Sequence, residues 1–529
     1  MAERTFYITT PIYYPSGEPH LGHAYTTICA DAVARFHRLR GDDTFFLTGT
    51  DEHGQKMVGE AAKLGIEPAE LAERMMSKFR GYFDEIGISY DDFIRTSEAR
   101  HRESVQAIVR AMLEAGDIYE GTYSGWYDVG EEAFVTETEA KANDYKSPVS
   151  GRPLTKYEEP SYFFRLTRYV PRLVEHIVAN PGFIQPEARR NKVLNDLKAG
   201  VGDLSISRAS LAWGVPMPND PKHVVYVWID ALSNYITALG YGSGDDGRYR
   251  RYWPGVHLIG KEILWFHTVY WPCMLMSLGQ PLPESVFAHG WWTAEGKKMS
   301  KSLGNFIGLD ELRRVTDYYG LEALRFYLLR AAPFGSDLDW QYEELHKSYL
   351  ELANVLGNGL NRVLKMTGKY RDSTLPGVDA SGAASAADID APLLARSEGV
   401  GSQVEDAWRS LSLQDAATLP LDLVREMNAY IDRTEPFKLA KDPQQAARLD
   451  AVLHNATIAL YRALVALLPI LPEKATAGLA QLGVDVAGRT FDDLMANPPA
   501  PGHRLGAGEP LFPRKDPLPA AEGDESAPE

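Results

Sequence analysis

Short apolar runs alternate with amphipathic stretches over the first third of the chain. Residues 6–10 (FYITT) and 44–50 (TFFLTGT) are β-branched and aromatic, which favours buried strands. Residues 21–40 carry apolar side chains at helical spacing and stop at a glycine. Strand and helix in alternation predict a parallel sheet covered by helices on both faces. The same patterns predict strands at 93–97, 223–229 and 256–260, and helices at 55–80 and 99–115.

The hydrophobic pattern divides the chain into an α/β part, an insertion and a helical part. Periodicity is weak in a central segment rich in aromatic residues, Gly and Pro, and helical patterns dominate the last third. The predicted divisions are 1–116 and 223–290 (the two halves of the α/β domain), 117–222 (an inserted domain), 291–340 (a lysine-rich loop and its surroundings), 341–510 (a helical domain) and 511–529 (a disordered tail).

Composition and charge exclude several classes of protein. The chain has 529 residues, a net charge of −17 and only two cysteines, Cys29 and Cys273. An acidic chain does not coat nucleic acid, and two cysteines exclude both a disulfide scaffold and a cysteine-based zinc knuckle. The amino terminus lacks the layout of a secretory signal, and no apolar run reaches the ~18 residues that span a bilayer. We therefore expect a cytoplasmic protein.

Two histidines stand where the first predicted strand gives way to a helix, in PHLGH (19–23). In a parallel sheet, ligands bind beyond the carboxyl ends of the strands, and a helix N-terminus there suits a phosphate. His20 and His23 can donate hydrogen bonds to phosphate oxygens, and Gly22 lets a nucleotide approach the backbone. This motif alone is equally compatible with a helix that merely carries two polar residues.

A second motif, KMSKS (298–302), lies far downstream in a glycine-flanked loop. A lysine-rich pentapeptide alone is usually a solvated turn, but together with PHLGH it makes the chain resemble the class I aminoacyl-tRNA synthetases. The resemblance implies a Rossmann-like catalytic domain that holds ATP and stabilises the charge built up as an amino-acid carboxylate attacks the α-phosphorus. It assigns catalysis to His20, His23, Lys298 and Lys301, and ATP contacts to Gly22, Gly260, Lys261, Glu262, Met299, Ser300 and Ser302. For Lys261, an ion pair with a nearby acid is an equal alternative to a contact with ATP.

Further stretches resemble one family of that class, the methionyl-tRNA synthetases, over nearly the whole chain. In FLTGTDEHG and DLSISR, the resemblance implies that Asp51 holds the amino group of the substrate and that Arg208 supports Asp51. From PIYYPSGEPHLGH, YVWIDALSNY and IGKEILWFH it implies a pocket for methionine, whose soft thioether packs against aromatic edges. Tyr14 and His267 are expected to supply hydrogen-bond donors to the sulfur. The expected lining is Ile12, Tyr14, Trp228, Ala231, Tyr235, Ile263 and His267.

The chain departs from the family pattern in the inserted segment and at the C-terminus. Residues 125–137 (GWYDVGEEAFVTE) lack the cysteine ligands of the zinc knuckle found in many members, so we expect no zinc and an insert that folds through its aromatic residues. Many bacterial relatives append a dimerising barrel for which this chain has no room, so we expect a monomer.

The helical part resembles the anticodon-binding bundle of the family. The resemblance implies that Asn358 and Arg362, one helical turn apart, hydrogen-bond to unstacked bases, with Asp432 as a further candidate. Phe437 stands where the family usually has tryptophan. It can stack on a base, but it lacks the indole N–H donor.

The implied activity is that of a methionine–tRNA ligase, which joins L-methionine to tRNA(Met) at the expense of ATP with Mg²⁺, for initiation and elongation of protein synthesis. Three alternatives remain open on the sequence. A smaller nucleotidylyltransferase would not need the helical bundle, and a non-catalytic RNA-binding relative would not need both motifs. Leucyl specificity would require a large editing domain, and cysteinyl specificity would require metal-binding cysteines.

Overall fold

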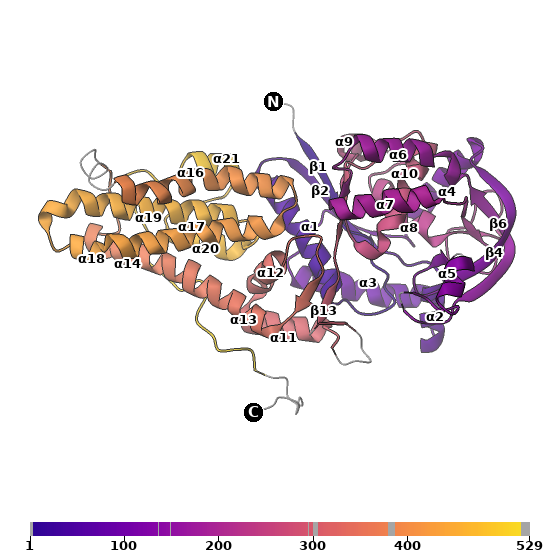
Figure 1. Ribbon diagram of the computed structural model, residues 1–529, viewed down its shortest axis with the longest axis horizontal. Helices are drawn as coiled ribbons and strands as arrows, with labels where there is room; N and C mark the ends of the chain where they lie inside the picture. Colours follow the sequence, from indigo (N-terminus) through magenta and orange to yellow (C-terminus); the bar gives the residue numbers. More distant parts are fainter. Residues whose placement is uncertain are drawn as a thin grey trace. The chain divides into compact units, whose positions relative to one another are not determined.

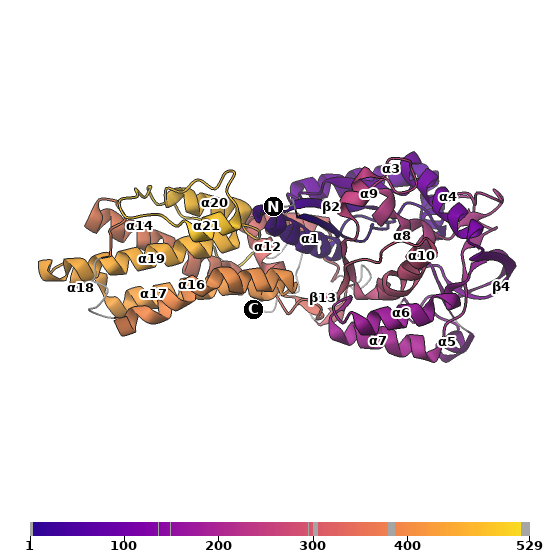
Figure 2. The same cartoon turned by 90° about the horizontal axis from the view of Figure 1, so that it is seen from above.

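The computed structural model describes residues 4–135, 137–148, 150–294, 296–299, 305–378 and 387–519. The chain forms two compact units, whose elements can be followed in Figures 1 and 2. Unit 1 comprises residues 1–34 and 43–291, and unit 2 comprises residues 35–42 and 292–529. The six-part division expected from the sequence stays a prediction.

A six-stranded, wholly parallel sheet forms the core of unit 1. In order across the sheet, its strands are β3 (Asp92–Arg95), β2 (Asp43–Thr50), β1 (Thr5–Thr9), β11 (Val256–Gly260), β12 (Ser285–His289) and β7 (Ile184–Gln185). Ile8 of β1 is paired with Phe46 of β2 on one side and with Val256 of β11 on the other. Strands β11 and β12 are buried along their whole length, as expected of strands covered on both faces. The predicted parallel α/β fold is confirmed.

Helices connect these strands and cover the sheet. The predicted helix at 55–80 is in fact two helices, because Gly65 adopts a left-handed conformation (φ 67°) that ends the first, and Pro68 begins the second. Besides α5, which is described below, the helices of unit 1 are α1 (Leu21–Leu39, whose residues from Arg35 belong to unit 2), α2 (Gln55–Leu64), α3 (Pro68–Glu85), α4 (Ala99–Glu114), η1 (Leu166–Arg168), α6 (Val170–Ala179), α7 (Glu187–Ala199), α8 (Val227–Thr237), α9 (Gly247–Tyr252), η2 (Lys261–Ile263), η3 (Phe266–Tyr270) and α10 (Trp271–Ser277).

The strand predicted at 223–229 is wrong. Only β10 (Val224–Val225) is extended there, and it pairs with β9 (Ser207–Arg208), whereas helix α8 begins at Val227. Almost every residue of α8 is buried, its polar ones included, so the helix has no solvent-exposed face. Periodicity cannot distinguish such a helix from a buried strand in a short apolar run.

Segment 117–222 forms a second, antiparallel sheet. Its strands, in order, are β5 (Ala133–Val135), β4 (Ile118–Asp128), β6 (Thr155–Phe164) and β8 (Leu204–Ser205), and the short helix α5 (Glu137–Ala142) follows β5. The long pair β4 and β6 is labelled in Figure 1. Rings of Tyr119 and Phe163 stack across it at 5.6 Å, in keeping with the aromatic content of the segment. The segment is not wholly separate from the parallel sheet, because β7 lies within it and pairs with β12.

A small sheet and a helical bundle form unit 2. The sheet has the order β14 (Lys297–Lys298), β13 (Trp292–Ala294), β15 (Leu338–Trp340). Its helices are α11 (Leu309–Tyr319), α12 (Leu321–Arg330), α13 (Tyr342–Glu351), η5 (Leu352–Gly357), α14 (Asn358–Arg371), α16 (Ala387–Arg409), α17 (Leu413–Thr434), α18 (Pro436–Leu439), η6 (Pro443–Gln445), α19 (Ala446–Leu467), α20 (Pro472–Gln481) and α21 (Phe491–Ala496). Helices α16, α17 and α19 lie side by side in both views. Inside the bundle, Arg448 forms an ion pair with Asp390 at 2.7 Å. The predicted helical C-terminal region is confirmed.

The expected disorder of the tail from residue 511 is wrong for the part that the structure describes. Leu511 and Phe512 are buried, and the ring of Phe512 meets Tyr349 of α13 edge-on at 6.2 Å. The N–H of Leu518 donates to the hydroxyl of Tyr319 at 2.9 Å. The composition of the tail is polar and rich in proline, but buried apolar side chains and hydrogen bonds hold its described part against the helices. Residues 520–529 lie outside the described part.

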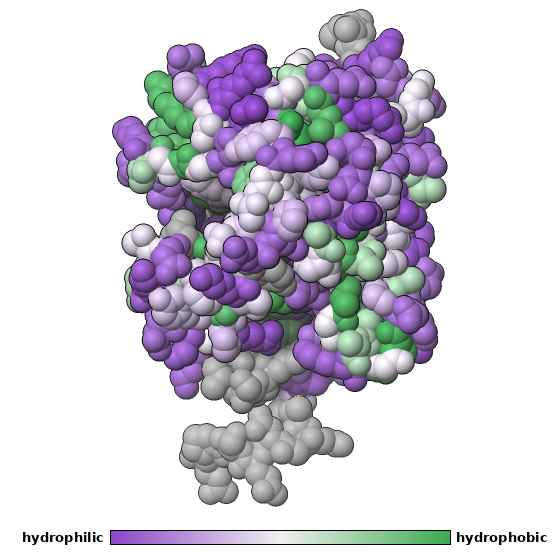
Figure 3. All heavy atoms as spheres, turned by 90° about the vertical axis from the view of Figure 1, so that its right-hand side faces the viewer, coloured by the Kyte–Doolittle hydropathy of each residue, from purple (hydrophilic) through white to green (hydrophobic). Residues whose placement is uncertain are grey.

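Hydrophilic residues cover most of the face of the molecule shown in Figure 3. Hydrophobic residues form only small, separate patches on that face. Within the described ranges, no helix is long and apolar enough to cross a membrane.

Candidate active site

The two histidines of the first motif lie at the junction of β1 and α1, and the backbone fixes the tautomer of both. The N–H of Gly22 donates to Nδ1 of His20 at 3.1 Å, and the N–H of His20 donates to Nδ1 of His23 at 3.2 Å. Because each Nδ1 accepts a hydrogen bond, each neutral imidazole carries its proton on Nε2. The rings lie 3.8 Å apart. A Cβ at position 22 would approach Cε1 of His20 to 3.0 Å, so glycine also leaves room for this ring.

His23 is held rigidly and is neutral. Its ring meets the edges of Tyr13 at 4.8 Å and Phe79 at 5.0 Å, and its carbonyl accepts the hydroxyl of Thr27 at 2.8 Å. Burial, with smaller contributions from His20 and Lys56, lowers the pKa of His23 well below its ordinary value. The site therefore offers a neutral N–H donor rather than an imidazolium at neutral pH.

The second motif lies only partly within the described residues. Lys298 is in β14, where its backbone is paired with Thr293 of β13, and Met299 is half-buried. Ser300, Lys301 and Ser302 lie outside the described residues. The roles of all five residues in holding ATP stay predictions.

Residues 260–262, which follow β11 and were expected to contact the nucleotide, interact with one another and with Trp291. A Cβ on Gly260 would lie 2.2 Å from Oε1 of Glu262, so only glycine allows this carboxylate to turn toward the strand end. The indole N–H of Trp291 donates to the other oxygen of Glu262 at 2.7 Å, and Nζ of Lys261 lies 4.2 Å from the centre of the Trp291 ring. Trp291 thus organises both charged side chains, a role that the sequence did not indicate.

The residues predicted to line the methionine pocket follow neighbouring strands of the parallel sheet, at their carboxyl ends, or lie on α8. Trp228 of α8 stacks on Phe266 with ring centroids 3.7 Å apart, and the ring of His267 stands edge-on to it at 6.2 Å. Ala231 is also on α8 and is buried. Ile12 and Tyr14 come after β1, Asp51 comes after β2, and Ile263 and His267 come after β11.

The polar groups of Tyr235 and His267 are paired with one another. Nδ1–H of His267 donates to the carbonyl of Ile263 at 2.9 Å, and Nε2 accepts the hydroxyl of Tyr235 at 2.6 Å. Burial lowers the pKa of His267 to about 4, so it is neutral and has no second proton to give. The hydroxyl of Tyr14 donates to the carbonyl of His53 and to Glu132. In this arrangement both donors are used within the protein, and the expected contact of His267 and Tyr14 with the thioether stays a prediction.

Two buried polar atoms of the predicted pocket have no hydrogen-bond partner among the residues that the structure describes: Oδ1 of Asp51 and Nε1–H of Trp228. Burial, then the charges of Asp230 and Glu132, raise the pKa of Asp51 well above its ordinary value. The backbone of His53 hydrogen-bonds to this carboxylate, but its Oδ1 stays unsatisfied. An incompletely paired buried carboxylate is costly, and a cation that enters the site relieves that cost. The chemistry of Asp51 fits the ammonium group of an amino acid.

A chain of buried charged and polar groups supports the loop that follows Asp51. Nδ1–H of His53 donates to one oxygen of Asp230 at 2.6 Å, and Nε2–H of His101 donates to the other at 2.8 Å. Although burial opposes ionisation, these two histidines lower the pKa of Asp230 to about 2. Sequence reasoning assigned no role to these residues, although His53 and Asp230 lie within the quoted motifs.

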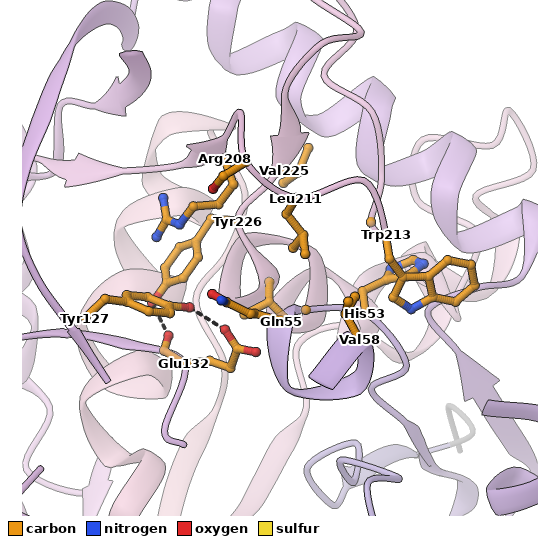
Figure 4. A pocket seen from close by; sticks show the side chains of 14 residues that line it. His53, Gln55, Val58, Tyr127, Glu132, Arg208, Leu211, Trp213, Val225 and Tyr226 are labelled. Atoms are coloured by element: carbon orange, nitrogen blue, oxygen red, sulfur yellow. Dashed lines mark hydrogen bonds between the residues drawn. The ribbon is translucent and has the colours of Figure 1, made fainter. Parts of the chain in front are cut away.

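Arg208 lines a pocket of about 180 Å³ next to this loop. Its guanidinium lies over the rings of Tyr226 at 4.6 Å and Tyr127 at 5.2 Å, and it donates to the carbonyl of Ser207 at 2.6 Å. Figure 4 shows Arg208, Tyr127 and Tyr226 grouped on one side of the pocket and His53 and Trp213 on the other. The support that Arg208 was expected to give Asp51 stays a prediction.

The residues predicted to read the anticodon lie on neighbouring helices of unit 2. Arg362 of α14 forms an ion pair with Asp432 of α17 at 2.5 Å and donates to the amide oxygen of Asn428 at 3.3 Å. Asn358, one turn earlier on α14, is exposed. Phe437 of α18 is 53% exposed.

Metal ligands were not expected. Within the described ranges, no three His, Cys, Asp or Glu side chains form a group that could hold a metal ion.

In the cysteine-free turn of the insert, Oδ1 of Asp128 accepts the N–H groups of Gly130 at 2.9 Å and Glu131 at 3.3 Å. Cys29 and Cys273 are both buried, and burial raises the pKa of Cys273 to about 12. The expected absence of zinc stays a prediction.

The low pKa of His267 predicts an effect of pH on stability. Below pH ~6.5 the unfolded chain protonates this histidine, whereas the folded protein does not do so until about pH 4. The free energy of unfolding therefore falls as the pH falls, and His267 alone contributes a loss of roughly 1 to 2 kcal/mol between pH 6.5 and pH 5. Urea denaturation of the wild type and of His267→Gln at both pH values measures this contribution. Parallel changes in the two proteins would contradict it.

Comparison with known proteins identifies the family. The sequence model of the family "tRNA synthetases class I (M)" matches residues 6–364. The methionine–tRNA ligase of Halalkalibacterium halodurans is 46% identical over 527 residues, which cover 97% of this chain and 79% of that protein. A structure of the Mycobacterium tuberculosis methionyl-tRNA synthetase in complex with methionyl-adenylate is 40% identical and superimposes with a TM-score of 0.91 over 97% of this chain and 100% of that chain. The free form of the same enzyme gives 38% identity and a TM-score of 0.84 over 97% and 99% of the two chains. The chain belongs to the methionyl-tRNA synthetases, the methionine–tRNA ligases of class I.

Proposed function

We propose that this chain activates L-methionine with ATP and transfers it to tRNA(Met), with the residues predicted above in the roles predicted for them. The observation that carries the assignment of residues is the buried Oδ1 of Asp51, which has no hydrogen-bond partner among the described residues, together with the stacked rings of Trp228 and Phe266. An ammonium group fits the carboxylate, and an apolar thioether side chain fits the rings.

In the proposed first step, a carboxylate oxygen of methionine attacks the α-phosphorus of ATP, and the bond from this phosphorus to the pyrophosphate oxygen breaks. Charge builds on the phosphoryl oxygens in the transition state. Nε2–H of His20 and Nε2–H of His23 donate to these oxygens, and Lys298 and Lys301 supply positive charge. ATP enters as its Mg²⁺ complex. In the second step, a terminal ribose hydroxyl of the tRNA attacks the carbonyl carbon of the adenylate, and AMP leaves.

Pyrophosphate exchange into ATP, measured with each of the twenty amino acids and without tRNA, tests the proposed activation. We expect exchange with methionine alone, unchanged by a chelator that removes zinc but leaves Mg²⁺. Exchange with another amino acid would retain the ATP site and overturn the pocket. Inhibition by the chelator would overturn the expectation of a zinc-free insert, and no exchange at all would favour a non-catalytic RNA-binding relative.

The exposed ring of Phe437 predicts a defect confined to tRNA. If the ring stacks on a base of the anticodon loop, Phe437→Ala loses ~1–3 kcal/mol of stacking, so the KM for tRNA(Met) rises about fivefold to a hundredfold. Methionine-dependent exchange without tRNA is expected to stay unchanged. Leu394→Ala, which removes another partly exposed apolar side chain of unit 2, is the control. An equal effect of both variants on aminoacylation would contradict stacking by Phe437.

We also propose that the protein acts as a monomer in the cytoplasm, as its sequence led us to expect. Light scattering at micromolar concentration measures the mass in solution. A mass near 58.8 kDa supports the monomer, and a value near twice that overturns it.

A further inference from the structure

The turn of the insert that lacks cysteines sends a carboxylate into the catalytic domain. Residues 129–132 connect β4 to β5, and Asp128 closes the start of the turn through its contacts with Gly130 and Glu131. Glu132, at the end of the turn, adopts a left-handed backbone conformation with φ 50°. That conformation costs a residue with a side chain about 1 kcal/mol, so other contacts must hold it.

Glu132 is only 4% exposed, and its carboxylate has partners on both oxygens. Oε1 accepts the backbone N–H of Lys56 at 2.7 Å and the hydroxyl of Tyr14 at 3.2 Å, and Oε2 accepts the hydroxyl of Tyr127. The carbonyl of Glu132 accepts the hydroxyl of Tyr226 at 2.6 Å. Figure 4 shows the side chain between Tyr127 and Gln55 at the edge of the pocket.

The two partners of Oε1 lie on different segments of the chain. One segment is predicted to line the methionine pocket, and the other directly follows the loop that carries Asp51. Tyr14 is a predicted lining residue. Lys56 is in the first turn of α2, directly after the loop that carries Asp51, and no side chain within α2 caps this helix. A carboxylate at a helix N-terminus satisfies an N–H that has no partner in the helix and is attracted by the helix dipole. Glu132 therefore ties the Tyr14 segment to the loop that carries Asp51.

The junction leaves no room for a side chain at position 54. A Cβ on Gly54, whose φ is 99°, would lie 2.3 Å from the hydroxyl oxygen of Tyr14 and 2.9 Å from Oε1 of Glu132. The hydroxyl of Tyr14 also donates to the carbonyl of His53. The positions of Tyr14, the 53–56 backbone and Glu132 are therefore fixed together, and a displacement of one moves the others.

We propose that Glu132 is a positioning residue for methionine: it sets the distance between Tyr14 and the loop of Asp51, and so couples the turn of the insert to the amino-acid pocket. The inference rests on the proposed function, because it takes Tyr14 and Asp51 as methionine contacts. Glu132 itself touches neither ATP nor the reacting atoms in this scheme. Its loss should weaken methionine binding and leave the binding of ATP unchanged.

Glu132→Gln tests the proposal, since the amide has the same shape but cannot accept hydrogen bonds on both sides. In pyrophosphate exchange we expect the KM for methionine to rise about tenfold, because hydrogen bonds to a charged group are lost. The KM for ATP and the kcat should stay within about twofold of the wild type. Glu158→Gln, which changes an exposed carboxylate on β6 of the same sheet, is the matched control and should leave all three constants unchanged.

Tyr14→Phe separates positioning from a merely structural role. If Glu132 acts through Tyr14, the effects of the two substitutions on the KM for methionine are not additive in the double variant. Additive effects, an unchanged KM for methionine in Glu132→Gln, or a parallel rise of both KM values would each overturn the proposal. If Glu132→Gln does not fold, Glu132→Asp serves instead, because its carboxylate is one methylene too short to reach both Lys56 and Tyr14. No exchange in the wild type would instead overturn the proposed function.

Discussion

Asp51→Asn is expected to lower kcat/KM for methionine in pyrophosphate exchange by about a hundredfold to a thousandfold. Oδ1 of Asp51 is buried without a hydrogen-bond partner among the described residues, in the part of the sheet where a ligand binds. An amide in its place leaves the ammonium of the substrate buried without a counter-charge, and breaking a buried ion pair on one side costs ~3–5 kcal/mol. The KM for ATP should change little, since the histidines proposed to contact ATP lie at another strand end.

A substrate analogue gives this prediction its control. The methionine analogue that lacks the amino group, 4-(methylthio)butanoate, has nothing for Asp51 to hold. The wild type should therefore bind methionine far more tightly than the analogue, whereas Asp51→Asn should bind the two with similar affinity in calorimetry. If the variant still prefers methionine as strongly as the wild type, the ammonium is held elsewhere.

The raised pKa of Asp51 adds an effect of pH to the same experiment. Burial is the largest cause of the shift, so the free enzyme protonates this carboxyl at a higher pH than an exposed aspartate. Only the ionised form pairs with an ammonium. The KM for methionine in the wild type should therefore rise as the pH falls, and in Asp51→Asn it should not follow the same curve.

The sequence predicts the parts of the fold that depend on local pattern and on the residues at strand ends. The runs at 6–10, 44–50 and 256–260 are short, apolar and bounded by helices or turns, and all three are strands of the parallel sheet. Helix α8 was mistaken for a strand because it is buried all round, and burial is a property of the whole fold that a local window does not contain. Phe512 was expected to lie in a disordered tail, because composition does not reveal that a single ring packs against another part of the fold.

The candidate site also has parts that the sequence predicts and parts that only the fold determines. PHLGH alone indicates a phosphate-binding helix start, but the tautomers of His20 and His23 depend on backbone N–H groups that only coordinates reveal. Glu132 lies 118 residues from Tyr14 in the chain, and no pattern in the sequence links them. His53 and Asp230 were within quoted motifs, yet their hydrogen bond spans 177 residues. Contacts of this kind are set by the packing of the domain rather than by spacing.

His23→Asn is expected to lower the kcat of methionine activation by about a hundredfold to a thousandfold, with little change in either KM. In the structure Nδ1 of His23 accepts a backbone N–H, so the reactive donor is Nε2–H. Asparagine offers an acceptor close to the position of Nδ1 but has no group at the position of Nε2. The loss of one preorganised donor to the charge of a transition state costs ~3–4 kcal/mol.

His23→Gln is the matched variant, because its side-chain N–H₂ reaches close to the position of Nε2 and replaces the lost donor. It should recover part of the rate that His23→Asn loses, although both variants lose the ring contacts with Tyr13 and Phe79. Thermal denaturation of the two variants checks that they lose similar stability, so that a difference in kcat reports the donor and not the packing. Equal rates for the two variants would assign the effect of His23 to packing. The rate of the wild type should also stay flat from pH 7 to pH 8 as far as this histidine is concerned. Burial lowers the pKa of His23 well below its ordinary value, so the neutral ring keeps its N–H over this range.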